Sequence, residues 1–143
     1  MKTVVIDTNV FISALNKADT PPRSVLRLCF KHRLMPLMGM ALLTEYEDIL
    51  ERDSLFINCP LNKEERLQFF SDFISLCKWT PIYYLWRPNL IDEADNHLIE
   101  LAVAGNATHI ITGNIKDFKR KELLFPSVKI RTPRDFLNQQ KEN

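Results

Sequence analysis

The sequence contains very little glycine, and this scarcity argues against one large class of enzymes. Only three glycines occur in 143 residues, at Gly39, Gly105 and Gly113. No Gly-x-Gly-x-x-Gly motif can be assembled from them, so the phosphate-binding loop of dinucleotide-dependent dehydrogenases is missing. We therefore do not expect a nucleotide-binding dehydrogenase.

Cysteine is also sparse, and its spacing does not suggest a zinc site. Cys29, Cys59 and Cys77 are an odd number, lie far apart and include no Cys-x-x-Cys pair. No nearby histidine completes a zinc ligand set. We expect these residues to be reduced thiols.

Long apolar runs and a strong excess of one charge are missing as well. No run approaches the length of a membrane span, and the three apolar residues before Asp7 are too few for a signal peptide. We expect a cytoplasmic protein with no membrane segment. Nineteen basic and eighteen acidic residues give a net charge of +1, so a polyanionic partner would have to bind a local basic patch.

Apolar segments of two lengths alternate along the chain and predict an α/β fold. Val4, Val5 and Ile6 are consecutive β-branched residues, which is typical of a strand buried on both faces. Further strands are expected at 34–40, 80–85, 108–112 and 128–131, and helices at 9–15, 21–32, 41–53, from 62, before Gly105, at 118–124 and from 132. This order predicts a single domain, residues 1–143, built as a three-layer α/β/α sandwich with a mainly parallel central sheet.

Carboxylates follow or border several of these elements. Asp7 ends the first strand, and ligands of open α/β sheets collect at the carboxyl ends of strands. Asp95 lies in the first turn of a helix, and Glu45 is the acid nearest the apolar face of the helix at 41–53. Asn114 and Asp117 follow the strand at 108–112. Helix capping by Asp7 or Asp95 and an ordinary boundary position for Glu45 are the structural alternatives.

Several carboxylates without histidine or cysteine partners are typical of a hard, oxygen-rich cation site. Mg²⁺ and Mn²⁺ prefer such ligands, and a cation would keep neighbouring carboxylates ionised together. His97 is set aside, because no second histidine at helical spacing accompanies it. The residues therefore suggest metal-assisted phosphate chemistry.

The motifs resemble one family in particular. The stretch Val-Ile-Asp-Thr-Asn-Val-Phe-Ile-Ser-Ala at the start, Glu45-Tyr46, the run Asp92-Glu93-Ala94-Asp95-Asn96 before an apolar helix, and Ile-Ile-Thr-Gly-Asn-Ile-Lys-Asp-Phe occur in an order similar to that of the PIN-domain ribonucleases. That family includes the VapC-type toxins of bacterial toxin–antitoxin pairs. The resemblance spans nearly the whole chain, and it is the order of the motifs that makes it specific.

The resemblance implies a set of site residues. The catalytic acids would be Asp7, Glu45, Asp95 and Asp117, with Asp7, Asp95 and Asp117 as metal ligands and Thr8 and Asn114 as supporting polar residues. Many family members carry an acid where this chain has Asn114, so Asn114 and Asp117 compete for the fourth position. Asp117 has an alternative role as the cap of the short helix that follows it.

The resemblance also implies an activity and partners. The expected reaction is Mg²⁺- or Mn²⁺-dependent cleavage of single-stranded RNA, which leaves a 5′-phosphate and a 3′-hydroxyl, and the expected partners are an antitoxin protein and a second copy of the chain. The basic residues available for flanking phosphates are Lys116, Lys119, Arg120 and Lys121, with a helical stripe of Arg23, Arg27 and Lys31. A solvated surface explains these basic residues equally well.

Two other functions remain open at this point, and so does the role of one apolar helix stripe. A phosphatase of the haloacid dehalogenase type also has an Asp after its first strand, but it requires a second Asp where this chain has Asn9. An RNA-binding or scaffold protein without catalysis is a further alternative. Phe69, Phe73 and Leu76 widen the apolar stripe of the helix that starts near 62, which fits either core packing or contact with a second subunit.

Overall fold

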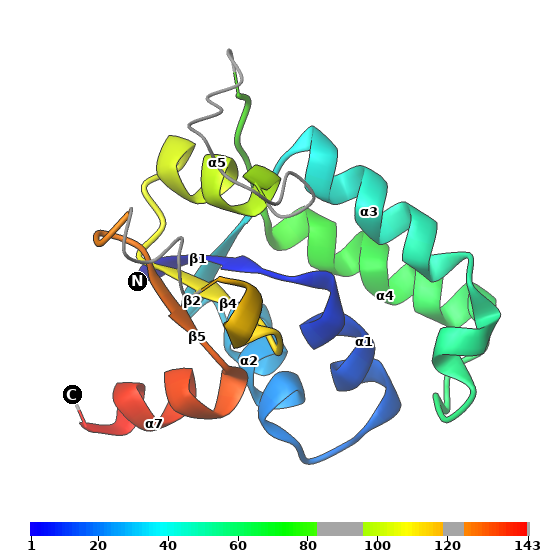
Figure 1. Ribbon diagram of the computed structural model, residues 1–143. Coiled ribbons are helices and arrows are strands. Elements are labelled where there is room, and N and C mark those ends of the chain that lie inside the picture. The colour runs from blue at the N-terminus through cyan, green and yellow to red at the C-terminus, as the bar shows by residue number, and fades with distance from the viewer. Residues whose placement is uncertain (83–95, 119–124, 143) are drawn as a thin grey trace.

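The computed structural model describes residues 1–82, 96–118 and 125–142, and its centre is a parallel sheet (Figure 1). Five strands lie in the order β3-β2-β1-β4-β5, and every described pairing is parallel. The strands are β1 (Lys2–Ile6), β2 (Leu34–Met38), β3 (Lys78–Trp79), β4 (His109–Ile111) and β5 (Lys129–Arg131). The predicted parallel α/β architecture is confirmed.

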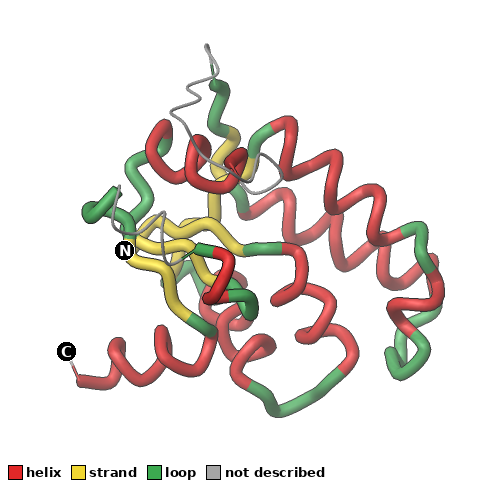
Figure 2. Tube along the Cα trace, in the orientation of Figure 1, coloured by secondary structure: helices red, strands yellow, loops and turns green. Residues whose placement is uncertain are grey.

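Helices cover both faces of this sheet and make a three-layer sandwich. Figure 1 shows α5 on one side of the strands and α2 and α7 on the other, and Figure 2 shows the strands enclosed between the helices. The helices are α1 (Thr8–Asn16), α2 (Pro21–Phe30), α3 (Met40–Leu50), α4 (Lys63–Leu76), α5 (Asn96–Ala104) and α7 (Pro133–Glu142), with short 3₁₀ turns η1 (Asp53–Phe56) and η3 (Ile115–Asp117). None of the described helices has the length and apolar character needed to cross a membrane.

Local sequence chemistry explains several of these elements. The β-branched run of β1 is buried on both faces, with Val4, Val5 and Ile6 at most 1% exposed. Helix α4 begins with the expected capping box, in which the Asn62 side chain accepts from the Glu65 amide at 2.8 Å and the Glu65 carboxylate accepts from the Asn62 amide at 3.0 Å. Such caps satisfy backbone donors that a helix start leaves unpaired.

Several predicted boundaries were wrong in the described part of the chain. The strand expected at 34–40 ends at Met38, because Gly39 is the N-cap of α3. The strand expected at 80–85 is instead the two-residue β3, and only the Thr80 amide continues the ladder, by donating to the Met38 carbonyl at 2.8 Å. Pro81 has no amide to donate, which ends the pairing. The helix expected at 41–53 ends at Leu50, and η1 follows as a separate turn. Residues 83–85 and the helix expected at 118–124 lie mostly outside the described residues.

The aromatic stripe of α4 packs inside the chain itself. Phe73 is 1% exposed, and the Phe69 ring lies 5.7 Å from the Phe11 ring and 5.2 Å from the Phe30 ring, measured between centroids. Leu76 also packs against the core. Core packing therefore accounts for the width of the stripe, and the stripe by itself does not indicate a second subunit.

The same core holds the start of the candidate site in place. Tyr46 of α3 is fully buried, packs edge-on against Phe11 at 5.3 Å, and donates its hydroxyl to the Ile6 carbonyl at 2.8 Å. This bond ties α3 to the last residue of β1. The three cysteines are free thiols as expected, and burial raises the pKa of Cys29 and of Cys77 to about 12, which keeps both in the unreactive protonated form.

Candidate active site

The register of the sheet brings two strand ends together at Asp7. In the pairing of β1 with β4, Ile6 lies opposite Ile111, so Asp7 and Thr112 are the next residues on their strands. The Asp7 amide donates to the Ile111 carbonyl at 3.0 Å, and the Asp7 side chain is the N-cap of α1. Asp7 is only 7% exposed. Its carboxylate therefore stands at the carboxyl edge of the sheet, where ligands of such folds bind.

Three donors from neighbouring described residues orient the Asp7 carboxylate. Oδ1 accepts from the Thr8 amide at 2.8 Å, and Oδ2 accepts from the Thr112 hydroxyl at 2.8 Å and from the Asn9 amide at 3.1 Å. Hydrogen bonds to a carboxylate favour its charged form and restrict its rotation. Asp7 is therefore the cap of α1, and its second oxygen receives side-chain donors, while its role as a catalytic or metal-binding residue stays a prediction.

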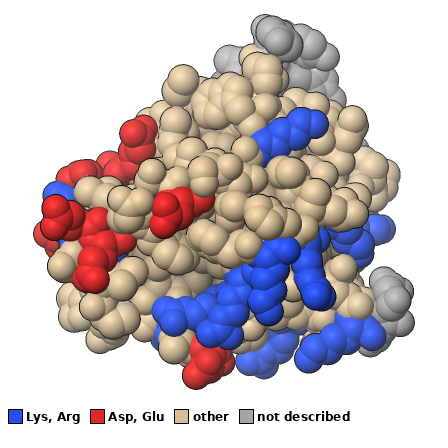
Figure 3. Space-filling view, turned by 180° about the vertical axis from the view of Figure 1, so that it is seen from behind, with Lys and Arg blue, Asp and Glu red and all other residues tan. Residues whose placement is uncertain are grey.

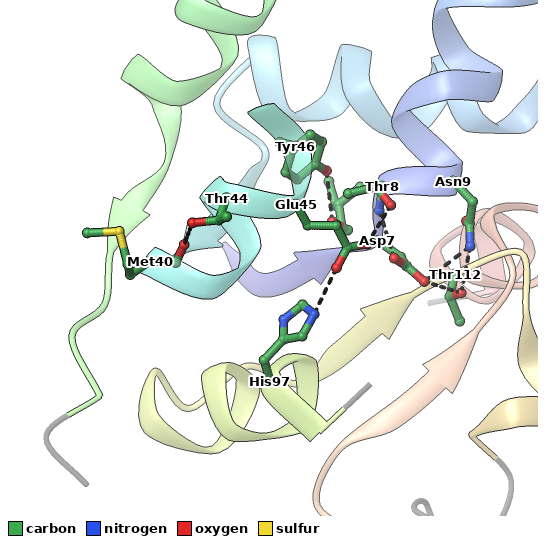
Figure 4. A network of polar contacts seen from close by, with 10 residues as sticks. Asp7, Thr8, Asn9, Met40, Thr44, Glu45, Tyr46, His97 and Thr112 are labelled. Carbon is green, nitrogen blue, oxygen red and sulfur yellow. Dashed lines mark hydrogen bonds and ion pairs between the residues drawn. The ribbon is translucent and has the colours of Figure 1, made fainter. Parts of the chain in front are cut away.

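Thr8 links Asp7 to a second carboxylate, Glu45 of α3 (Figure 4). The Thr8 backbone bonds Asp7, and the Thr8 hydroxyl donates to Glu45 Oε1 at 2.8 Å. Glu45 Oε2 lies 2.8 Å from His97 Nε2, so each oxygen of Glu45 has one hydrogen-bond partner. The His97 hydrogen bond lowers the pKa of Glu45, with the Thr8 hydrogen bond acting in the same direction and burial opposing both. Glu45 is therefore a carboxylate at neutral pH.

His97 is the main site residue that the sequence reasoning missed. It lies in the first turn of α5 with a side chain that is 17% exposed, and its Nδ1 atom is buried without a hydrogen-bond partner in the described part of the chain. A metal-binding histidine on a helix commonly has a second histidine at helical spacing, whereas the contact of His97 is with a carboxylate. Its place at the start of a helix that follows an acidic cluster was the available signal.

Asn9 and Thr112 were also missed, and they connect Asp7 to the loop after β4. The Asn9 amide group donates to the Thr112 hydroxyl at 3.3 Å, and its Oδ1 accepts from the Gly113 amide at 2.9 Å. The Asn114 amide in turn donates to the Thr112 hydroxyl at 3.0 Å. Thr112 could have been noticed as a polar residue that ends a buried strand, as Asp7 does.

The structure thus places some predicted site residues together, whereas others lie outside the described residues. Asp7, Thr8 and Glu45 form one network, and the exposed Asn114 adjoins it through Thr112. Asp95 and the side chain of Asp117 lie outside the described residues, although the backbone of Asp117 ends η3. Among the residues the structure describes, no three His, Cys, Asp or Glu side chains form a group able to hold a metal ion.

The basic residues divide into structural and surface positions. Arg23 donates from Nε to the Ala14 carbonyl at 2.8 Å, which caps the end of α1, and Arg27 lies 3.9 Å from Asp19. Lys119, Arg120 and Lys121 lie outside the described residues. Figure 3 shows lysine and arginine gathered in the lower part of one face and most of the visible acids at its left border. The net charge of +1 therefore hides a marked separation of charge.

Comparisons with known proteins agree with this geometry. Residues 3–116 match a family model described as PIN domain. No curated protein matches the sequence. Among solved structures, the chain is similar to VapBC2 from Rickettsia felis, crystallised with a DNA fragment from their promoter. That match has a TM-score of 0.60 at 20% identity and covers 91% of this chain and 98% of the other, which supports the fold.

Proposed function

The chain belongs to the PIN domain family, and from that premise we propose that it is a metal-dependent ribonuclease that cleaves single-stranded RNA with an activated water molecule. The observation that carries the proposal is the pair of carboxylates, Asp7 and Glu45, joined through Thr8 at the carboxyl edge of the sheet. Two acids on different elements, oriented by fixed donors, suit metal-assisted phosphodiester hydrolysis, in which carboxylates hold a cation and position a water molecule.

The residues present fit a hard divalent cation. Asp7 and Glu45 offer only oxygen atoms as ligands, and each oxygen of Glu45 retains an acceptor site beyond its one described hydrogen bond. We propose that Asp7, Asp95 and Asp117 hold Mg²⁺ or Mn²⁺, with Asn114 as the competing residue for the fourth position. When bound, such a cation supplies Lewis-acid activation of water and offsets the charge of the phosphate.

The chain's own residues would position the reactants. Thr8 and His97 hold the two oxygens of Glu45, so its carboxylate is fixed and ionised and can accept a hydrogen bond or a proton from the attacking water. Thr112 and Asn9 hold Oδ2 of Asp7 in the same way. Both carboxylates are thereby held in place before the reactants bind, so the site would need little reorganisation during the reaction.

The biological setting is proposed from the family and from the similar structure. We propose that the chain is the toxin of a toxin–antitoxin pair with a cytoplasmic antitoxin partner, since the similar structure is a VapBC2 assembly. We also propose a homodimer, as the resemblance implies, and a sedimentation mass that stays monomeric at all micromolar concentrations would exclude it. A PIN-fold RNA-binding or RNA-processing protein without a toxin role is the alternative.

Magnesium and manganese titration with a fluorogenic single-stranded RNA tests the activity. We expect Asp7→Asn and Glu45→Gln to lower turnover about a hundredfold or more, because each removes a charge from the site at constant volume. Glu47→Gln is the matched control, since Glu47 is an exposed acid on the same helix. Wild-type turnover in both site variants, with circular dichroism unchanged, would refute the assignment. RNA binding without cleavage by the wild type would favour the non-catalytic alternative.

A further inference from the structure

An open pocket of about 310 Å³ lies at the same edge of the sheet as Asp7. Its walls come from α1, from the starts of α2 and α7 and from the loop after β4, and they include Asn9, Ser13, Pro22, Asn114 and Pro133. Pockets that bind small ligands commonly have volumes of about 300 to 1,000 Å³. This pocket is at the lower end of that range, which suits a single ring system.

Asn9 lines this pocket and also contacts the Asp7 carboxylate. Its amide nitrogen bonds Asp7 and Thr112, and its carbonyl oxygen accepts from Gly113, another residue of the pocket wall. Figure 4 shows Asn9 and Thr112 on one side of Asp7 and Glu45 and His97 on the other. An RNA strand that passes over Glu45 and then Asp7 and continues in the same direction would therefore reach the pocket next.

The lining favours a neutral ring over a phosphate group. Among the described residues that line it, none carries a charged side chain, and two are prolines, Pro22 and Pro133. Because proline has no backbone N–H, these two helix starts lack one of the donors that an anion would use. Apolar ring faces instead offer a surface on which a planar group can lie.

Two polar side chains remain available to recognise such a group. The Ser13 hydroxyl and the Asn114 side-chain amide have no hydrogen-bond partner among the described residues, and both line the pocket. An asparagine amide offers a donor and an acceptor side by side, and a hydroxyl can serve as either. The edges of nucleobases present complementary pairs of donors and acceptors.

We propose that this pocket binds one unstacked base of a single-stranded RNA, that of the nucleotide next to the scissile phosphate, and that Ser13 and Asn114 contact its edge. The proposal rests on the RNA substrate proposed above and adds to it a subsite that selects a base. Sequence-specific recognition of single-stranded RNA commonly works in this way, by taking a splayed base into a pocket.

An abasic scan tests the pocket. A fluorescein-labelled RNA that spans a site cut by the wild type is titrated into the Asp7→Asn protein, which keeps the RNA intact. One nucleotide at a time is replaced by an abasic residue. We expect one position beside the cut to lose about fivefold in affinity, since stacking and edge contacts of a single base contribute at least that much in single-strand binders.

Adding Ser13→Leu to the Asp7→Asn protein then tests whether the loss of affinity arises in the pocket. The larger side chain fills the space, so the intact RNA should bind about fivefold more weakly and the abasic residue at that position should cause no further loss. Ser71→Leu, at an exposed serine on α4, is the matched control and should leave both affinities unchanged. An abasic effect of equal size in the Ser13→Leu and Ser71→Leu proteins would overturn the pocket assignment alone. No RNA binding by any of the proteins would overturn the proposed function and the subsite together.

Discussion

At the scale of single residues, the site is defined by how carboxylate oxygens are held. Asp7 and Glu45 each have both oxygens bonded to fixed donors, and Thr8 bonds both acids, one with its backbone and one with its hydroxyl. His97 extends this arrangement from a third element, α5. Because its contact is to Glu45, its role in the proposed reaction is to position that carboxylate.

Two substitutions of His97 distinguish a role in positioning Glu45 from a role in packing alone. We expect His97→Leu to lower kcat about tenfold at unchanged KM for RNA, because a hydrogen bond to a charged group is lost. His97→Gln keeps an N–H donor and should recover most of the rate. Initial rates of both variants and their direct Mn²⁺ affinities are the measurements. Equal losses for Leu and Gln, or a change confined to KM, would show that His97 does not position Glu45.

At the scale of elements, close packing between α5 and β2 orders the helix that carries His97. The chain leaves α5 at Gly105, whose amide donates to the Leu101 carbonyl at 3.0 Å. A Cβ atom at Gly105 would lie 2.3 Å from Cδ1 of Leu37, which is 1% exposed in β2. A glycine is needed here because the helix end meets the sheet without room for a side chain.

Gly105→Ala is therefore expected to destabilise the fold by about 1–3 kcal/mol, the usual cost of overpacking a core. Chemical denaturation of the variant measures this. In a Leu37→Val background, which lacks the contacting Cδ1 atom, the same substitution should cost clearly less. If the cost of Gly105→Ala is the same in both backgrounds, the clash with Leu37 is not its cause.

At the scale of the whole molecule, charge is unevenly distributed although its sum is near zero. Basic side chains gather on one part of the surface in Figure 3, while the acids of α3 and α4 lie toward another. Positively charged side chains also lie close enough to a buried histidine, His109, to affect its pKa. His109 begins β4, lies 5.0 Å from the Phe136 ring of α7, and is only 7% exposed.

His109 makes stability depend on pH. Burial, and then the charges of Lys2, Arg131 and Lys129, lower the pKa of His109 from 6.5 to about 4. Its folded-state pKa lies below its unfolded value, so the unfolded chain binds the proton first as pH falls. The free energy of unfolding should be unaffected by His109 above pH 6.5 and fall by about 3 kcal/mol toward pH 4. His109→Gln should flatten that part of the profile, measured by urea denaturation at several pH values. An unchanged slope would assign the acid sensitivity to other groups.

Local patterns in the sequence were sufficient to predict much of the fold and the position of Asp7 in the candidate site. The β-branched run that forms β1, the capping box of α4 and the position of Asp7 at a strand end all depend on residues within a few positions of one another. Propensity, periodicity and capping act over that range, so these features could be predicted. Glu45, Asp95 and Asp117 were also candidates from their positions, and the PIN-like order of motifs gave them catalytic roles; of these three, only Glu45 has a described side chain.

The long-range contacts of the candidate site were decided by tertiary structure. The Thr8–Glu45 contact joins residues 37 positions apart, and the His97–Glu45 contact joins residues 52 apart. Such contacts depend on the register of β1 with β4 and on how α3 and α5 are rotated about their axes, which only the packing of the complete core determines. Asn9 shows the same dependence: in sequence it is the residue that argued against a phosphatase, and in the folded chain it is the shared wall between the Asp7 site and the neighbouring pocket.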